Sequence, residues 1–267
     1  MESGQRELGR VGMKLEIRNL IHVILDTVFP IQCLGCKSEG AWLCEKCLRA
    51  IPLKEIDHCP QCKQHSAGGA YCEHCRPQSF LEGIAVAADY HNPVVTQAIK
   101  TLKYRFMPDV GAQLSRLLVW RVQDLARRAP QSAGHWLGTA GEAPFSFFGS
   151  FSNIVVIPVP LHPRRLRWRG FNQATQLARG FAEELQLPCN DIDLRRVHHT
   201  KSQAQLHASE RKRNLQNSFV WRGGDLAGRK ILLIDDVATT GATLQACGQA
   251  LQAAGAAAIW GLVVAQN

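Results

Sequence analysis

The sequence lacks an apolar run long enough to cross a membrane. A spanning helix needs roughly 18 or more apolar residues, and the nearest candidate, residues 251–265, is shorter and is interrupted by Gln252. The N-terminal segment also lacks the features of a secretory leader, because it carries Glu16 and Asp26 and has no small-residue cleavage site. These absences predict a cytoplasmic protein without a membrane span.

Acidic residues are scarce in one part of the chain. Between Pro158 and Lys230 there are 14 Lys and Arg against 6 Asp and Glu, whereas the remainder is nearly balanced, with 17 against 16. This local excess of positive charge predicts a polyanionic ligand, either a phosphorylated small molecule or a nucleic acid. Charge alone leaves open the alternative of a solvated basic face that binds no ligand.

Cysteine is abundant, and eight of the ten cysteines form four C-x-x-C pairs within a segment of 43 residues. The pairs are Cys33 and Cys36, Cys44 and Cys47, Cys59 and Cys62, and Cys72 and Cys75. Two such pairs supply the four thiolates of a tetrahedral zinc site. The segment has too few large apolar side chains to fold on a core of its own, and zinc contributes on the order of 10 kcal/mol per structural site.

We therefore expect two structural zinc ions. Disulfides are disfavoured, because cytoplasmic thiols stay reduced. Sequential pairing, with the first two C-x-x-C pairs on one ion and the last two on the other, is the simpler arrangement, and a cross-braced arrangement remains open. The nearby His58, His65 and His74 are expected to be bystanders. Cys247 lies on the apolar face of a predicted helix and is expected to be a core residue.

Alternating strands and helices after the cysteines predict an α/β fold with a mainly parallel sheet covered on both faces. We expect strands over 83–90, 154–159, 192–197, 230–235 and 257–264, and helices from Pro93, over 108–127, around 174–185 and over 241–254. The predicted domains are a tail with an amphipathic helix over 1–32, a double zinc-binding module over 33–76, and a main domain over 77–267 with an inserted loop over 130–152. Residues 198–217 read as a mobile loop that ends in a short helix.

Residues 231–243 read ILLIDDVATTGAT and place Asp235 and Asp236 at the carboxyl end of a strand, where ligands of such sheets collect. No lysine follows the glycine, which excludes a Walker A loop. The helix that starts near Gly241 offers free amides and a favourable dipole to an anion. The carboxylates can accept hydrogen bonds from a ribose diol or hold hydrated magnesium. Together these groups predict a ribose 5-phosphate site; a capped strand-to-helix turn would explain the threonines but not the two acids.

The same stretch closely resembles the signature of type I phosphoribosyltransferases for phosphoribosyl pyrophosphate (PRPP), which has four apolar residues, two acids and a T-G-x-T turn. Three further features resemble the ComF family of competence proteins and their GntX-type relatives. They are PVPLHPRRLRWRGFNQA at 158–174, the pattern Q-x-x-L-x-x-x-x-R-x-x-N at 203–214, and the cysteine-rich N-terminal part. The resemblance covers roughly residues 20–267 and implies a type I phosphoribosyltransferase-like sheet with an N-terminal double zinc ribbon.

The resemblance also implies roles for individual residues. Asp235 and Asp236 would hold the ribose hydroxyls and Arg211 would belong to a flexible lid, together with Lys201 or Arg213; these two acids and Arg211 would be the catalytic residues. The 5-phosphate cradle would comprise Ala238, Thr239, Thr240, Gly241, Ala242 and Thr243. The pyrophosphate loop would contain Leu161, His162, Arg164 and Arg165, with both arginines and Arg211 as a clamp. Lys100 and Lys103 match another block of the family, without an assigned contact.

At the level of function, the resemblance implies a PRPP-binding protein linked to DNA uptake and natural transformation, which handles incoming single-stranded DNA. One alternative is an active phosphoribosyltransferase of nucleotide or nucleoside metabolism that uses Mg-PRPP and an acceptor the sequence does not identify. Another is a docking module for a helicase-like competence protein. Aromatic residues interleave with the basic ones, a composition that suits single-stranded DNA; they are Trp168, Phe171, Phe219 and Trp221.

Overall fold

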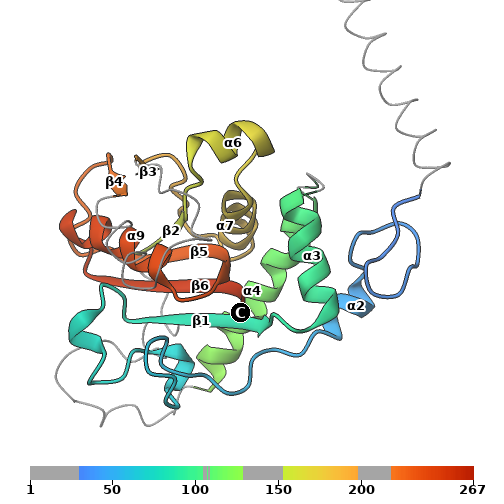
Figure 1. The fold of residues 1–267 in the computed structure, drawn as a ribbon, viewed down its shortest axis with the longest axis horizontal. Coiled ribbons are helices and arrows are strands. Elements are labelled where there is room, and N and C mark those ends of the chain that lie inside the picture. The colour runs from blue at the N-terminus through green and yellow to red at the C-terminus, as the bar shows by residue number, and fades with distance from the viewer. Residues whose placement is uncertain (1–29, 105–106, 108, 129–152, 198–217) are drawn as a thin grey trace, which may run out of the picture. The chain divides into compact units, whose positions relative to one another are not determined.

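The computed structural model describes residues 30–104, 107, 109–128, 153–197 and 218–267 (Figure 1). The chain separates into two compact units, residues 1–48 and 49–267. Three predicted features lie outside the described residues: the N-terminal helix within 1–32, the insert over 130–152, and the basic loop over 198–217.

The larger unit contains a four-stranded sheet in the order β1-β6-β5-β2, and all of its neighbouring strands are parallel. The strands are β1 (Gly83–Asp89), β2 (Ile154–Pro158), β5 (Lys230–Ala238) and β6 (Ala258–Gln266). Their apolar side chains are buried almost without interruption, as expected for a parallel sheet with both faces covered. The predicted α/β architecture is therefore confirmed.

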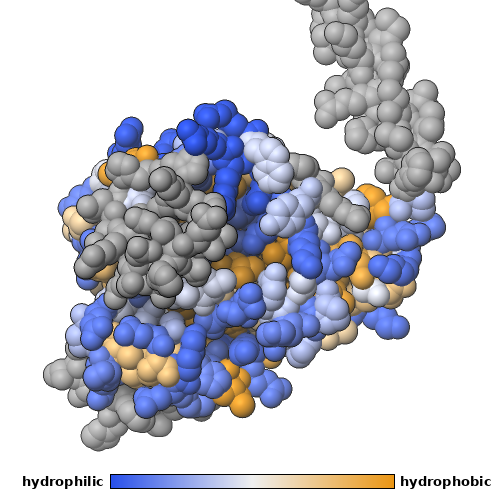
Figure 2. Space-filling model, viewed as in Figure 1, coloured by the Kyte–Doolittle hydropathy of each residue, from blue (hydrophilic) through white to orange (hydrophobic). Residues whose placement is uncertain are grey.

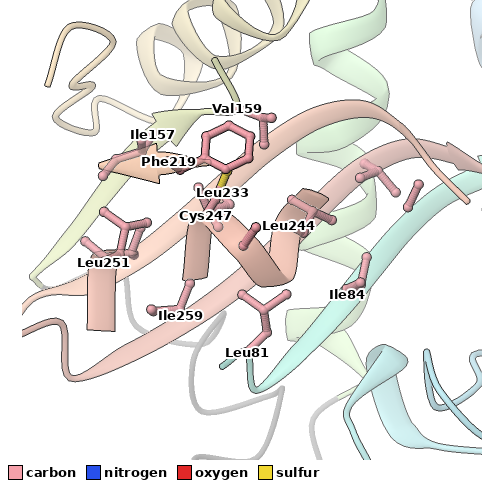
Figure 3. Close-up of a cluster of buried hydrophobic side chains, with 14 of the residues drawn as sticks. Leu81, Ile84, Ile157, Val159, Phe219, Leu233, Leu244, Cys247, Leu251 and Ile259 are labelled. Carbon is pink, nitrogen blue, oxygen red and sulfur yellow. The ribbon is translucent and has the colours of Figure 1, made fainter. Parts of the chain in front are cut away.

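Helices cover both faces of this sheet. α4 (Asp109–Arg127) and α7 (Gln173–Glu184) pack on one face, and α9 (Ala242–Ala253) packs on the other (Figures 1 and 3). The α9 side chains Leu244, Cys247 and Leu251 meet apolar side chains of the strands, and Cys247 lies in this core as predicted (Figure 3). Burial of this apolar surface is the main stabilising contribution at the sheet face.

α3 (Pro93–Tyr104) begins at the predicted proline, whose missing amide costs nothing in the first turn of a helix. Asn92 caps this helix, because its Oδ1 accepts hydrogen bonds from the amides of Val94 and Val95 at 3.0 and 3.2 Å. The helix ends beside the carboxyl end of β5, which brings its last turn to the candidate site described below.

Two parts of the fold differ from the sequence-based expectation. β3 (Leu194–Arg196) is shorter than the predicted strand and pairs antiparallel with β4 (Phe219–Trp221), outside the parallel sheet. α6 (Pro163–Arg169) forms where only a turn was expected. Its exposed arginines give it no apolar periodicity that would predict a helix. The helix begins after an N-cap at His162 and ends at Gly170, which is in the left-handed conformation.

The remaining described helices are short and lie near the cysteines. They are α2 (Glu45–Arg49) and the 3₁₀ turns η1 (Ala67–Gly69) and η2 (Arg76–Gln78). In the part of the chain that the structure describes, we find no helix with the length and apolarity that crossing a membrane requires.

Candidate functional site

Two adjacent carboxylates lie near the carboxyl end of β5. Asp236 is 3% exposed and forms an ion pair with Lys103 in the last turn of α3, with 2.5 Å between Oδ2 and Nζ. Asp235 is half-buried, and burial together with the neighbouring Asp236 carboxylate raises the pKa of Asp235 well above its usual range. Asp236 is thus compensated directly, whereas Asp235 is the acid that a ligand hydroxyl or a cation would stabilise most.

A buried arginine connects this acid pair to the basic segment. Arg169 Nη1 donates a hydrogen bond to Gln173 Oε1 at 2.7 Å, and Gln173 Nε2 donates to Asp236 Oδ1 at 3.5 Å. The Arg169 guanidinium also lies over the ring of Tyr104, 5.7 Å from its centroid. Burial lowers the pKa of Arg169, and its Nε finds no hydrogen-bond partner among the described residues. An anionic ligand could accept a hydrogen bond from this buried donor.

The turn after β5 presents backbone amides. Gly241 has φ +72°, and the first hydrogen bond of α9 runs from Gln245 N–H to the Gly241 carbonyl, at 2.9 Å. The amides before that bond have no partner within the helix, and the helix dipole adds positive potential at this end. Thr239 and Thr240 are exposed at the rim of the turn. The arrangement suits a phosphate group.

The basic helix α6 begins at a side-chain cap and ends at the left-handed Gly170. His162 Nδ1 accepts a hydrogen bond from the Arg164 amide at 3.1 Å, and Asn172 Nδ2 holds the following loop to the Val159 carbonyl at 3.0 Å. The arginines along α6 are exposed except for Arg169 (Figure 2 shows the hydrophilic cover of this region). Arg165 is close enough for its charge to contribute to the lowered pKa of Arg169.

A further arginine joins the same charge cluster from β3. Burial, followed by the charge of Arg165, lowers the pKa of Arg196, while Asp235 opposes that shift. Its guanidinium lies 5.3 Å from the ring centroid of Phe219 on β4. Three arginines from two elements, Arg165 and Arg169 on α6 and Arg196 on β3, therefore contribute positive charge near the two carboxylates. This is a suitable environment for a polyanion that also carries hydroxyl groups.

The eight paired cysteines form two sequential groups of four. Within each group all sulfur atoms lie within 4.8 Å of one another. Cys36 and Cys44 place their sulfurs 3.7 Å apart, and Cys62 and Cys72 place theirs 3.6 Å apart. Zinc–sulfur bonds of about 2.3 Å in a tetrahedral site give a sulfur–sulfur distance of about 3.8 Å. The donor set fits structural zinc, and the separations exclude disulfides.

The first C-x-x-C turn of each group has the same backbone conformation. Lys37 and Lys63, each next to the second cysteine of a C-x-x-C turn, have φ of 65° and 64° and donate their amides to Cys33 and Cys59. Neither group contains a histidine in the described chain, so His58, His65 and His74 are bystanders as predicted. Sequential pairing is observed; the cross-braced alternative is not.

Comparison with known proteins assigns both regions. The family model of the phosphoribosyl transferase domain matches residues 169–267, and that of the double zinc ribbon domain matches residues 24–76. DNA utilization protein YhgH of Escherichia coli K12 is 32% identical over 224 residues, which cover 82% of this chain and 88% of that protein. The chain belongs to the ComF family.

Two other relatives carry competence names. Competence protein F of Haemophilus influenzae is 28% identical over 246 residues, 88% of this chain and 97% of that protein. Competence protein ComFC of Streptococcus pneumoniae is 24% identical over 222 residues, 82% and 86% of the two chains. For this ComF-family chain, the zinc ribbon match and the two cysteine groups together support two structural zinc sites.

The structure groups most of the residues that the sequence singled out in this ComF-family chain. The end of β5 and the following turn hold Asp235, Asp236 and residues Ala238 to Thr243 in succession. Arg165 on α6 and Asp235 both influence the pKa of Arg196, with opposite effects. No contact in the described chain ties Arg164 to them beyond its place on α6. Arg211, Lys201 and Arg213 lie outside the described residues.

Three residues around the acids received no role from the sequence. Lys103 was noticed in AIKTLKY but had no contact, and Arg169 and Gln173 were read only as part of the RGFNQA stretch. No helical spacing marks the contact between Arg169 and Gln173, because Arg169 ends α6 and Gln173 begins α7. Lys100, the other lysine of that block, is exposed one turn earlier on α3.

Proposed function

We propose that this ComF-family chain binds Mg-PRPP at the carboxyl end of β5 and takes part in handling incoming single-stranded DNA during DNA uptake. The observation that carries the PRPP part is a close succession of groups on one strand and its following turn: Asp236 paired with a lysine, Asp235 beside it, and helix amides without an intrahelical partner. A ribose diol and a 5-phosphate are the groups that such a succession complements.

In this proposal Asp235 and Asp236 accept the ribose hydroxyls, and the turn from Ala238 to Thr243 holds the 5-phosphate. The diphosphate lies toward Arg164 and Arg165 on α6, and the unpaired Nε of Arg169 adds a buried donor on that side. Magnesium, when bound with PRPP, would neutralise part of the diphosphate charge. Arg211 remains proposed as a lid residue on the strength of the family resemblance.

The DNA part rests on two supports. Several relatives are named as competence or DNA utilization proteins, and the basic region carries exposed aromatic side chains such as Trp168 on α6. This role would place the chain in the cytoplasm, where a helicase-like competence protein is a suitable partner for the zinc ribbon module.

Calorimetry with PRPP in the presence of Mg²⁺ tests the first part of the proposal. We expect saturable binding to the wild-type protein and loss of binding in the variant that combines Asp235→Asn and Asp236→Asn. Lys100→Gln, on the exposed side of α3, is the matched control and should bind as the wild type does. A wild-type protein that shows no heat of PRPP binding would refute the proposal.

Competition between the two ligands tests the second part. Fluorescence anisotropy with a labelled single-stranded oligonucleotide is measured with and without PRPP and across a range of salt concentrations. If one site serves both ligands, PRPP displaces the oligonucleotide and the double Asp→Asn variant changes both affinities. If DNA uses another surface, that variant loses PRPP binding alone. Absence of oligonucleotide binding at low salt would contradict the DNA part.

The second candidate is an active phosphoribosyltransferase, and the pair of adjacent acids directly before the phosphate turn is the observation that favours it. Loss of pyrophosphate from C1 develops positive charge on the ribose, which the carboxylates of Asp235 and Asp236 would stabilise. The arginines would neutralise the departing diphosphate, and an acceptor nucleophile would form the new bond at C1. Release of pyrophosphate only when one member of a panel of nitrogen bases is added would support turnover. If no base in the panel causes pyrophosphate release, the result would count against turnover.

A further inference from the structure

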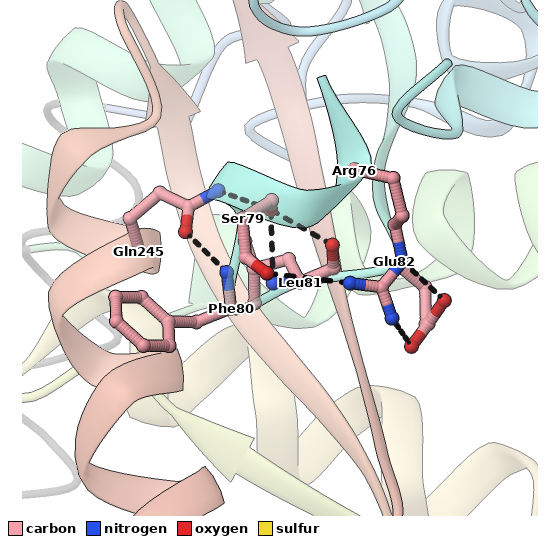
Figure 4. A network of polar contacts seen from close by, with 6 residues as sticks. All are labelled: Arg76, Ser79, Phe80, Leu81, Glu82 and Gln245. Carbon is pink, nitrogen blue, oxygen red and sulfur yellow. Dashed lines mark hydrogen bonds and ion pairs between the residues drawn. The ribbon is translucent and has the colours of Figure 1, made fainter. Parts of the chain in front are cut away.

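One glutamine connects the phosphate turn to the second group of cysteines. Gln245 lies in the first turn of α9, and its Nε2 donates hydrogen bonds to Tyr71 Oη and to Ser79 Oγ, both at 2.6 Å. Its Oε1 accepts from the amide of Phe80 at 2.9 Å (Figure 4). All the donor capacity of the amide side chain is used, and every partner lies in the segment that contains or directly follows the second cysteine group.

The segment on the other side of these bonds is itself held firmly. Ser79 Oγ donates to the Leu81 carbonyl at 2.8 Å, and Arg76 Nε donates to Glu82 Oε2 at 2.8 Å (Figure 4). Tyr71, the residue before the zinc ligand Cys72, donates its amide to the Glu82 carbonyl at 2.9 Å. Residues 71–82, which lead into β1, are therefore held by hydrogen bonds of their own where they contact α9.

Close packing adds to these hydrogen bonds at the phosphate turn over 239–243. A Cβ at Gly241 would lie 2.8 Å from Ile84 Cδ1 and 3.9 Å from Tyr71 Oη. A Cβ at Gly248, two turns further along α9, would lie 3.0 Å from Leu81 Cδ2. The left-handed glycine of the phosphate turn is thus seated against the residues that flank the second zinc site, and little space remains for the turn to shift.

The second zinc site also shares its core with the helix. Cys59 and Cys75 are buried in the same apolar cluster as Leu244, Ile84 and Tyr71 (Figure 3 shows the helix side of this cluster). Cys36 and Cys62 occupy equivalent positions in the two cysteine groups and are both exposed, but only the second group lies in the unit that contains α9.

We propose that the second zinc site, acting through Tyr71 and Gln245, positions the phosphate turn over 239–243, so that ordered zinc at this site is needed for tight binding of a 5-phosphate. Gln245 is a positioning residue, since it acts through the turn. The inference rests on the proposed function, in which this turn holds the 5-phosphate of PRPP. The first zinc site belongs to the other compact unit and serves as the comparison in the second test.

The first test compares two glutamines on the same helix. Gln245→Met keeps the length of the side chain and removes its hydrogen bonds, while Gln249→Met, one turn further along α9, is the matched control. We expect Gln245→Met to weaken the binding of ribose 5-phosphate about tenfold, which corresponds to about 1.4 kcal/mol. Binding of magnesium pyrophosphate should change less than twofold in either variant, because pyrophosphate does not use this turn. Equal losses for both ligands would mean general destabilisation and would overturn the inference.

The second test compares the two zinc sites. Cys62→Ser and Cys36→Ser each remove one exposed ligand, and zinc content and thermal unfolding are measured for both. We expect Cys62→Ser alone to weaken ribose 5-phosphate binding and to speed hydrogen exchange at residues 239–243. Equal effects of the two variants on this turn, or none from Cys62→Ser after loss of its zinc, would overturn the coupling.

Failure of the proposed function would look different. If the wild-type protein binds neither ribose 5-phosphate nor PRPP, the proposed function is wrong. Hydrogen exchange at 239–243 still decides the positioning role, because faster exchange in Gln245→Met than in Gln249→Met supports it without any ligand. Unchanged exchange in Gln245→Met would overturn it.

Discussion

Lys103 and Asp236 join the last turn of α3 to the carboxyl end of β5, with 2.5 Å between the ammonium nitrogen and a carboxylate oxygen. The residues are 133 positions apart in the sequence, and both side chains are largely removed from solvent. Lys103 pairs directly with Asp236, and its charge also lowers the pKa of Asp235, where burial and the Asp236 carboxylate outweigh it. Asp235 is therefore the acid with the less complete compensation.

Lys103→Met should destabilise the protein, because the Asp236 carboxylate would remain buried without its cation. Removing one partner of a buried ion pair costs about 3–5 kcal/mol, and the partial exposure of Lys103 places the expected loss near the lower end, at about 3 kcal/mol. Lys100→Met on the exposed side of the same helix should change the free energy of unfolding by less than about 0.5 kcal/mol. Chemical denaturation of both variants measures this difference, and similar losses would contradict the role given to the ion pair.

Asp235→Asn should stabilise the protein at neutral pH. The pKa of Asp235 is raised in the folded state, so the folded protein binds more protons than the unfolded chain between the unfolded pKa near 4 and the raised folded value. Stability therefore falls as pH rises through that window, and an uncharged amide removes this loss. Denaturation midpoints between pH 4 and 8 should show a flatter profile in the variant. Asp236→Asn, which removes the partner of Lys103, should lower stability instead; stabilisation by both changes would count against the distinction between the two acids.

Zinc counting distinguishes sequential from cross-braced ligation. The purified protein should hold two zinc ions. Combining Cys36→Ser with Cys44→Ser should remove one ion, since both ligands belong to the first group, whereas combining Cys36→Ser with Cys62→Ser should remove both. A cross-braced arrangement would give the reverse pattern. Elemental analysis of the three proteins measures the stoichiometry directly.

The parts of this fold that could be predicted from sequence depend on local patterns. Apolar runs and helical spacing gave β5, α9 and the parallel sheet, and C-x-x-C spacing gave the zinc ligands. α6 was not predicted, because it is rich in exposed arginines and has no apolar face. β4 escaped because three residues are too few to show an alternation.

Contacts around the candidate site could not be predicted, because they join distant parts of the chain. Gln245 and Tyr71 are separated by 174 residues, and no local pattern links a helical glutamine to a tyrosine beside a zinc ligand. Arg169 was recognisable as a basic residue, but its burial depends on the return of the chain over Tyr104 and Gln173. The sequence therefore predicted a cluster of candidate site residues at the end of β5 and missed the residues that contact them.

Arg121 provides a last test, at the junction between α4 and the segment that leads into the second cysteine group. It is fully buried, forms an ion pair with Asp57, and donates a hydrogen bond from Nη1 to the Lys54 carbonyl at 2.7 Å. Arg121→Met would leave the Asp57 carboxylate and that carbonyl without their buried donor, so we expect a loss of about 3–5 kcal/mol in the free energy of unfolding. Arg127→Met, at the exposed end of the same helix, should cost less than about 0.5 kcal/mol. Because Asp57 lies two residues before Cys59, Arg121→Met should also speed the loss of one zinc ion to a chelator. Wild-type kinetics of zinc release in that variant would show that α4 does not support the second zinc site.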